Sequence, residues 1–213
     1  MNTSQEYKSK DCSSALGQNF EQKINKARLN LISMMILALY KVRMVNYMDL
    51  ANVFDSSANA ESSMRRIQCY MADFDLPMIL VSSFIFEILP EKKNLVFVLD
   101  RTNLKFGEAN INILMLRICY KNNAIPIMFT MLDKRGNSDT VERIEFIRQF
   151  INWFGNDCID CLLADRELVG PIWLEYLTQN KIKYHIRLRD IFKVSCFDKN
   201  EEKPVFRLFN KLQ

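Results

Sequence analysis

The sequence contains few residues that break regular structure. Glycine and proline occur only five times each in 213 residues, and no stretch is rich in serine, glutamine or proline, which argues against extended disorder. We expect disorder only in residues 1–18, which are polar and aperiodic. Apolar residues make up 49% of the chain, enough to fill the core of one large domain or two small ones.

Long apolar runs are also missing. The longest, Leu29 to Tyr40, is interrupted by polar residues and is shorter than the ~20 residues that span a bilayer. The N-terminal segment MNTSQEYKSK lacks the apolar centre of a secretion signal. We therefore expect a cytoplasmic protein without a membrane partner.

Residues that bind soft metals are scarce or poorly spaced. His185 is the only histidine, and a chain without a secretion signal normally keeps its six cysteines reduced. Cys158 and Cys161 have the spacing of a redox or zinc pair, but in a strand residues three apart point to opposite faces. No second such pair completes a zinc site, so we interpret the cysteines as core residues.

The net charge of +4 is small, but its distribution is uneven. Residues 1–93 contain 11 basic and 10 acidic side chains, whereas residues 181–213 contain 9 basic and 4 acidic ones. Such an excess favours a polyanionic partner. The alternative is an ordinary solvated strand and tail.

The first part of the chain has helical periodicity. Apolar residues recur at three- and four-residue spacing between Phe20 and Met44. Further helices are expected at 47–54, 60–74 and 78–89, with turn or proline residues between them. In the helix 60–74 we expect Met64, Ile67, Cys69 and Met71 to point mostly inward. Residues 19–92 are thus predicted to form a helical domain.

The second part of the chain alternates strands and helices. Strands are expected at 94–99, 111–120 and 124–132, then a helix from Asp139 to Gly155, a strand at 158–164, a helix at 171–180 and a half-exposed edge strand at 184–189. The first three strands are antiparallel neighbours, and the helix-linked strands are parallel. This order predicts an α/β (α+β) fold with a mixed sheet similar to that of ribonuclease H.

Two of the apolar strands are followed directly by an aspartate. Asp100 follows the first strand and Asp165 the fourth, and the carboxyl ends of such strands are where open α/β sheets bind ligands. If these strands are parallel neighbours, the two carboxylates lie together and favour a divalent cation, Mg²⁺ (or Mn²⁺). The alternative is that each aspartate only caps the following turn.

Several short motifs follow one another between about Arg28 and Asp190. They are Ser63-Met64-Arg65-Arg66-Ile67-Gln68, Asp100-Arg101-Thr102-Asn103 with Lys105 and Gly107, Ile111 to Met115, Ile125-Pro126, Lys134 to Ser138, and Ala164-Asp165-Arg166-Glu167 with Gly170 and Trp173. In order and spacing these motifs resemble those of the DDE transposases of bacterial insertion sequences, in the branch named for insertion sequence 4.

The resemblance implies that Asp100 and Asp165 are catalytic metal ligands in phosphodiester hydrolysis and strand transfer. It also implies double-stranded DNA, the terminal repeats of an element, as partner, a cytoplasmic protein at the nucleoid when bound, and a homodimer that cuts two ends together. Basic and hydroxyl side chains near the motifs suit phosphate contacts. Those expected to contact DNA are Ser62, Ser63, Arg65, Arg66, Arg101, Lys105, Arg166, Arg187 and Arg189.

The sequence departs from the family pattern at several places. Leu104 stands where an aromatic residue is commoner, and Cys69 where a basic one is. The family's catalytic glutamate lies beyond a β-rich insertion, so the core 93–192 is expected to be incomplete and 193–213 to begin that insertion or a tail. Glu167, Glu201 and Glu202 do not fit the role of the third ligand. We expect this chain to be inactive by itself.

Two alternatives remain open on the sequence. One is a non-catalytic DNA-binding transposase fragment that occupies element ends. The chain is also compatible with another ribonuclease-H-like nuclease, such as a junction resolvase. Cleavage of branched DNA without preference for transposon ends distinguishes the resolvase from the transposase.

Overall fold

The computed structural model describes residues 9–20, 23–134, 136, 138–189, 192–195, 202–205 and 207. The chain divides into two compact units, Met1–Leu80 and Val81–Gln213. The first unit is helical, and the second contains a five-stranded sheet. Each unit is described by itself below.

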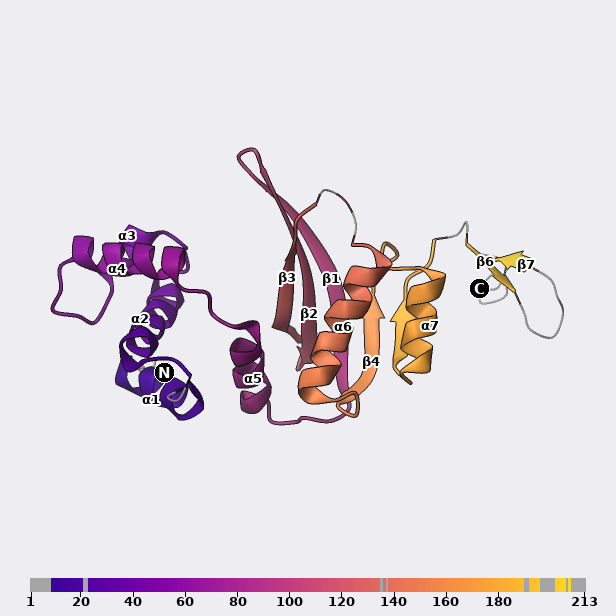
Figure 1. Ribbon diagram of the computed structural model, residues 1–213, viewed down its shortest axis with the longest axis horizontal. Helices are drawn as coiled ribbons and strands as arrows, with labels where there is room; N and C mark the ends of the chain where they lie inside the picture. Colours follow the sequence, from indigo (N-terminus) through magenta and orange to yellow (C-terminus); the bar gives the residue numbers. More distant parts are fainter. Residues whose placement is uncertain are drawn as a thin grey trace, which may run out of the picture. The chain divides into compact units, whose positions relative to one another are not determined.

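The helical unit consists of helices joined by short connections, and Figure 1 shows them at the N-terminal end of the chain. Asn25, Asn46 and Asn59 precede three of these helices, and each side chain accepts a backbone N–H of the first turn, which satisfies donors left free at a helix start. The helices are α1 (Ser9–Phe20), α2 (Lys26–Val42), α3 (Tyr47–Asn52), α4 (Ala60–Asp73) and α5 (Met78–Ile88), the last of which continues into the second unit.

No single helix in the described ranges is long and apolar enough to cross a membrane, and α4 and α5 reach that length and composition only when taken together. The helix expected from Phe20 begins later, at Lys26, because Asn25 caps it. Within the range 1–18, where we expect disorder, α1 forms from Ser9 onward. Its residues Leu16 and Phe20 are one turn apart and both buried, which gives this segment an apolar contact.

Fewer side chains of α4 are buried in the core of the helical unit than the sequence pattern predicts. Ile67 is fully buried and Met64 packs beside it. Cys69, two residues from Ile67, lies on another face of α4 and is exposed, whereas Met71 lies one turn beyond Ile67 in the last turn of α4 and is 53% exposed. The inward prediction is wrong for both residues. Cys119 is also exposed, whereas Cys158 and Cys161 are buried as expected. Cys12 is half-buried, so among the described cysteines the interpretation as core residues holds fully for Cys158 and Cys161. Cys196 lies outside the described residues.

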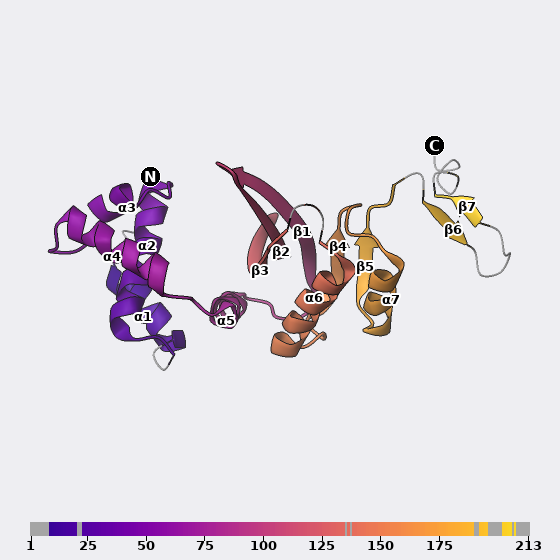
Figure 2. The same cartoon turned by 45° about the horizontal axis from the view of Figure 1, so that its top comes forward.

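The second unit is built on a mixed sheet with the strand order β3-β2-β1-β4-β5 (Figures 1 and 2). β1 pairs antiparallel with β2, and β2 with β3, while β1, β4 and β5 are parallel. This is the ribonuclease-H-like order predicted from the sequence. The elements are β1 (Leu95–Phe106), β2 (Ala109–Tyr120), β3 (Asn123–Leu132), α6 (Thr140–Phe154), β4 (Ile159–Ala164), α7 (Pro171–Gln179) and β5 (Lys183–Ile186).

Local signals account for the connections. Lys121 and Asn122 both have positive φ, as required at the two central residues of a tight hairpin turn between β2 and β3. Asp139 and Glu142 form the expected capping box of α6, which ends at Gly155. β5 alternates as predicted for an edge strand but ends at Ile186.

The first strand differs from its prediction. It does not end at Asp100 but continues to Phe106, and β2 begins at Ala109. The two strands are joined through Gly107, whose φ of 60° suits glycine in a tight turn. The resulting hairpin extends beyond the residues of β1 that pair with β4 (Figure 1). Asp100 consequently lies inside a long strand, where it follows the segment shared with β4.

The two faces of the sheet are unequally buried. Phe97 and Leu99 are almost fully buried, and the Phe97 ring packs against Phe150 of α6 at 4.9 Å between centroids. We call this side the covered face. Val98, Met115 and their neighbours alternate to the other side and are only partly buried; we call it the outer face.

A short hairpin of β6 (Lys193–Ser195) and β7 (Glu202–Pro204) forms a separate two-stranded sheet. It lies within residues 193–213, where we expect a β-rich insertion or a tail. Glu202 is exposed on β7, and Glu201 lies outside the described residues.

Candidate active site

The pairing of β1 with β4 brings the two predicted catalytic positions side by side. The strands are parallel, and Leu99 is the Cα partner of Ala164. Asp100, within β1, and Asp165, directly after β4, each come one residue beyond this last pair, so the two positions lie at the same end of the paired segment. The adjacency follows the prediction, and the assignment of both residues as metal ligands stays a prediction.

A third side chain lies in the same row. Ile186 of β5 is the Cα partner of Ala164, and the next residue, Arg187, donates its backbone N–H to the Ala164 carbonyl at 3.1 Å. The exposed Arg187 therefore follows β5 as Asp165 follows β4. A cation beside two carboxylates suits a phosphate that approaches this edge.

Asp100 lies on the outer face and pairs with an arginine that the sequence reasoning missed. Its Oδ2 is 3.4 Å from Nη1 of Arg117, and the Asp100 side chain is 39% exposed. Its Oδ1 accepts the backbone N–H of Arg101 at 2.8 Å. Arg117 lies two residues beyond Met115, the cross-strand partner of Asp100. The hairpin register would have identified it, because residues two apart share a face.

Asp165 is exposed and opens a tight turn. Its carbonyl accepts the backbone N–H of Leu168 at 2.9 Å, and Leu168 is fully buried. The side chain thus projects from a short segment that is tied to the core at both ends, by β4 on one side and by Leu168 on the other. Such a position suits a ligand for an incoming ion.

Arg101 does not take the position expected of a DNA contact. It lies on the covered face, where Nε and Nη2 donate to the two oxygens of Glu167 at 3.2 and 2.9 Å. Its side chain is 11% exposed. Because this guanidinium is already bonded to a carboxylate, we do not retain Arg101 in the DNA-contacting set.

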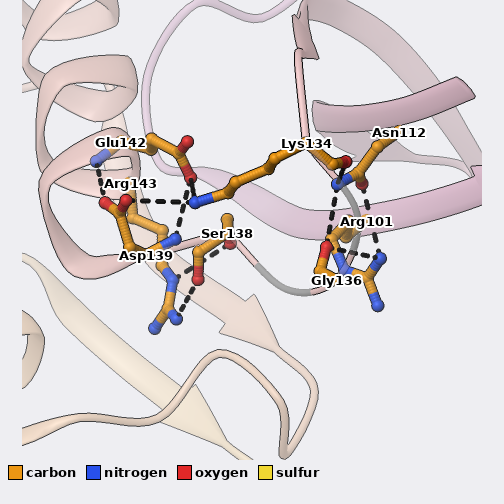
Figure 3. Close-up of polar contacts among 8 residues, drawn as sticks. All are labelled: Arg101, Asn112, Lys134, Gly136, Ser138, Asp139, Glu142 and Arg143. Carbon is orange, nitrogen blue, oxygen red and sulfur yellow. Dashed lines mark hydrogen bonds and ion pairs between the residues drawn. The ribbon is translucent and has the colours of Figure 1, made fainter.

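The loop after β3 is held by an amide on the covered face. The buried Asn112 donates to the carbonyls of Lys134 and Gly136 at 3.2 and 2.8 Å. Arg101 Nη1 also donates to the Gly136 carbonyl, at 3.3 Å (Figure 3). This network was not predicted from the sequence, because its partners come from segments far apart in the chain.

The start of α6 is stabilised by a cluster of charges (Figure 3). Lys134 Nζ lies 2.8 Å from Glu142 and 3.0 Å from Asp139. The hydrogen bonds to Glu142 and then to Asp139 raise the pKa of Lys134. The backbone N–H of Glu142, followed by the Lys134 ammonium, lowers the pKa of Asp139.

Arg143 completes this cluster from inside the protein. It is buried and donates to the hydroxyl and the carbonyl of Ser138. Burial lowers the pKa of its guanidinium, while Asp139 and Glu142 oppose that shift. Between β3 and α6, the described residues Lys134, Gly136 and Ser138 are therefore hydrogen-bonded by side chains of β1, β2 and α6.

The remaining predicted DNA contacts of this unit are exposed but not equally placed. Arg166 follows Asp165 directly, and Arg187 and Arg189 follow β5. Lys105 is also exposed but lies five residues beyond Asp100 on β1, about 16 Å along the strand. Lys105 is thus remote from the aspartate pair, because β1 continues where a turn was expected.

In the helical unit, one of the four predicted contacts is wrong. Ser63 is fully buried on the same side of α4 as Ile67, four residues on, and so cannot reach DNA. Ser62, Arg65 and Arg66 are exposed.

These arginines border a pocket of about 410 Å³ between α2 and α4. Arg28 of α2, which the sequence reasoning missed, also lines it and stacks over the Phe74 ring at 4.4 Å. The side chains of interest along this pocket are Arg28, Arg65, Arg66, Tyr70, Asp73 and Phe74.

Over the residues described, no three His, Cys, Asp or Glu side chains lie close enough together to hold a metal ion. The carboxylates available at the sheet edge are Asp100 and Asp165. Glu167 is two residues from Asp165, but its carboxylate is bonded to Arg101.

No protein-family model matches the chain, and no curated protein matches it. Among solved structures, it is similar to the catalytic core domain of HTLV-2 integrase in complex with magnesium, with 16% identity, a TM-score of 0.34, and coverage of 44% of this chain and 61% of that one. It is also similar to a chain of the simian T-cell lymphotropic virus intasome in complex with PP2A regulatory subunit B56 gamma. There the identity is 13%, the TM-score 0.35, and the coverage 62% of this chain and 45% of that one.

This chain therefore spans less than two thirds of either structure. The likeness is distant, and the strand order of the sheet itself defines the fold as ribonuclease-H-like.

Proposed function

We propose that the chain is the DNA-binding and metal-binding part of a DDE-type transposase of an insertion sequence. The observation that carries this proposal is the parallel pairing of β1 with β4, which sets Asp100 beside Asp165. The motif resemblance adds support, since it names the same two residues. The reaction proposed for the complete enzyme is phosphodiester hydrolysis at element ends followed by strand transfer.

The two carboxylates fit a hard divalent cation. Both are accessible, both offer oxygen ligands, and each comes one residue beyond the paired residues Leu99 and Ala164, which suits Mg²⁺ or Mn²⁺. When bound, such ions activate the attacking oxygen and stabilise the leaving one. In the proposed enzyme Asp100 and Asp165 hold the ions, and a third carboxylate is needed to fix a two-ion arrangement.

Other side chains of the outer edge are proposed to bind the DNA strand. Arg187 lies in the same row as the aspartates, and Arg166 and Arg189 are exposed close by in sequence. Guanidinium groups pair with phosphate oxygens by two parallel hydrogen bonds. They would hold the backbone of the DNA while the carboxylates act on one phosphate.

The helical unit is proposed to bind the terminal repeats through the pocket between α2 and α4. Arg28, Arg65 and Arg66 give this pocket three positive charges against the single negative charge of Asp73. Stacking on Phe74 orients the Arg28 guanidinium. Phosphates of double-stranded DNA are the ligands that this arrangement fits.

The metal site can be tested on the chain of 213 residues by titrating Mn²⁺ and recording water-proton relaxation. We expect saturable binding that weakens by about tenfold in Asp100→Asn and in Asp165→Asn, because each removes one charged ligand. Asp160→Asn is the matched control, since Asp160 is also on β4 but pairs with Lys183 at 3.3 Å. Equal Mn²⁺ affinity in all four proteins would remove the proposal.

A second candidate is a non-catalytic DNA-binding protein, favoured by the arginine-lined pocket, which does not depend on the aspartates. A gel-shift titration with double-stranded DNA at ~0.1 M salt separates the two functions. If the protein is non-catalytic, the wild type binds no Mn²⁺, and the Asp100→Asn, Asp165→Asn double variant keeps full DNA affinity. Loss of DNA affinity in Arg65→Ala, Arg66→Ala is expected in either case, and its absence would exclude the pocket.

A further inference from the structure

We infer that Arg101 and Glu167 form a positioning clamp that sets the Asp165 turn beside Asp100. This inference rests on the proposed function and assigns a role to two residues that are not metal ligands. It also gives a physical reason for two separate sequence motifs, because each motif contributes one partner of the clamp.

The geometry of the clamp is that of a bidentate ion pair. Arg101 Nε lies 3.2 Å from one Glu167 oxygen, and Nη2 lies 2.9 Å from the other. Two parallel hydrogen bonds fix both the distance and the plane of the partners, which a lysine could not do. With side-chain exposures of 11% and 25%, the pair is largely shielded from water.

The arginine is itself held from two further directions. Its Nη1 donates to the Gly136 carbonyl at 3.3 Å and contacts Asn112 Oδ1 at 3.4 Å. Asn112 is buried and bonded to the loop after β3. The guanidinium is thus a rigid reference point, rather than a mobile side chain that follows Glu167.

The carboxylate partner lies where it can control the catalytic position. Only Arg166 separates Glu167 from Asp165, and the turn closes when Leu168 donates its N–H to the Asp165 carbonyl at 2.9 Å. β4 ends at Ala164, so Asp165 itself lies beyond the strand. Fixing Glu167 therefore fixes the turn that carries Asp165.

The clamp and Asp100 occupy opposite faces of the sheet. Asp100 and Arg101 are consecutive residues of β1, and consecutive residues of a strand point to opposite sides. The clamp can accordingly hold the backbone from the covered face without its cation reaching the Asp100 carboxylate. It also engages both oxygens of Glu167, which explains why Glu167 does not serve as the third ligand.

The test uses the chain of 213 residues and two measurements. Hydrogen–deuterium exchange of the segment 164–170 reports the order of the turn, and Mn²⁺ titration reports the metal pair. The variants are Arg101→Gln, Glu167→Gln and both together. Glu145→Gln is the matched control, because Glu145 pairs with Arg148 on α6 in an exposed ion pair.

We expect each single variant to exchange the Leu168 amide faster and to weaken Mn²⁺ binding by about tenfold, as for other groups that orient metal ligands. The double variant should be no worse than either single variant, because both remove the same interaction. Glu145→Gln should match the wild type. A general loss of folding would instead accelerate exchange throughout β1 to β3.

Wild-type exchange and wild-type Mn²⁺ affinity in Glu167→Gln would overturn the clamp, as would additive losses in the double variant. Faster exchange at 164–170 with unchanged Mn²⁺ affinity would also overturn it as a positioning device. The proposed function fails separately: if Asp100→Asn binds Mn²⁺ as tightly as the wild type, the metal pair is wrong, and the exchange data alone decide whether the clamp orders the turn.

Discussion

The covered face and the outer face of the sheet treat two consecutive charged residues in opposite ways. On the covered face, Arg101 is bonded to Glu167, Asn112 and the Gly136 carbonyl and is almost inaccessible. On the outer face, Asp100 has one long contact with Arg117 and remains 39% exposed. Asp100 and Arg101 are consecutive in β1, so they point to opposite faces: one belongs to a candidate ligand site and the other to a structural network.

This difference follows from what each face must do. A polar group that is buried costs free energy unless its hydrogen bonds are complete, so the covered face fixes its side chains in one arrangement. A group that must accept an ion or a phosphate needs free bonding capacity, which the outer face leaves to Asp100 and Asp165. The hydrogen-bond network of the covered face therefore fixes the backbone that carries Asp100 and Asp165.

The largest expected effect comes from breaking the covered network at Asn112. Asn112→Ala removes the amide donor to the Lys134 carbonyl and leaves the Gly136 carbonyl with Arg101 Nη1 as its donor, and we expect a loss of about 1 to 3 kcal/mol in the free energy of unfolding. Urea denaturation measures it. Asn103→Ala is the control, because Asn103 is the exposed cross-strand partner of Asn112. Equal losses in both variants would contradict the comparison.

On the outer face, a change should affect binding more than stability. Arg187→Ala should weaken binding to double-stranded DNA several-fold and lower the slope of affinity against salt by about one, as for one lost phosphate contact. Arg148→Ala, an exposed arginine on α6, is the control and should bind as the wild type does. Gel shifts at several salt concentrations measure both, and identical slopes would exclude Arg187 from the interface.

A smaller effect is expected at Arg117, which competes with a cation for Asp100. Arg117→Met removes the positive charge 3.4 Å from Asp100 Oδ2 and keeps much of the packing. Because partly exposed ion pairs contribute about 0 to 1 kcal/mol, stability should hardly change, while Mn²⁺ binding should tighten about two- to threefold. Calorimetric titration with Mn²⁺ checks this. Weaker binding would show that Arg117 supports the metal pair instead of competing with it.

The fold could be predicted from the sequence where local signals decide it. The Lys121-Asn122 turn, the Asp139 capping box and the strand order all depend on residues close in sequence or on simple pairing rules, and these predictions are confirmed. The predicted length of β1 was wrong, because β1 continues beyond its apolar segment by pairing with β2 as far as the turn at Gly107. Composition alone does not reveal how far such pairing extends.

The candidate site was predictable only in its backbone. Asp100 and Asp165 are neighbours because strand order and register are enough to place them. The contacts of Arg117, Glu167 and Arg28 were not predicted, because they depend on side-chain direction and on partners distant in sequence. The catalytic and metal-binding roles stay predictions.

The smallest expected effect concerns the charged start of α6. Asp139 and Glu142 pair there with Lys134, whose carbonyl accepts a hydrogen bond from Asn112 of the covered face. The pKa of Asp139 is lowered chiefly by the Glu142 backbone N–H and then by Lys134. Its carboxylate therefore stabilises the fold above its unfolded pKa of about 3.9, and this contribution is lost as the pH falls through the lower folded value.

Asp139→Asn keeps a good helix cap but removes the charge. The melting temperature of this variant should therefore be slightly below that of the wild type at pH 7, and the gap should close as the pH is lowered below about 3.9. The raised pKa of Lys134 does not disturb this test, because the ammonium contributes fully at every pH below its unfolded pKa of about 10.4. If the difference in melting temperature between Asp139→Asn and the wild type stays constant from about pH 7 to about pH 3, it does not depend on the ionisation of Asp139. The charge would then have no part in stabilising the start of α6.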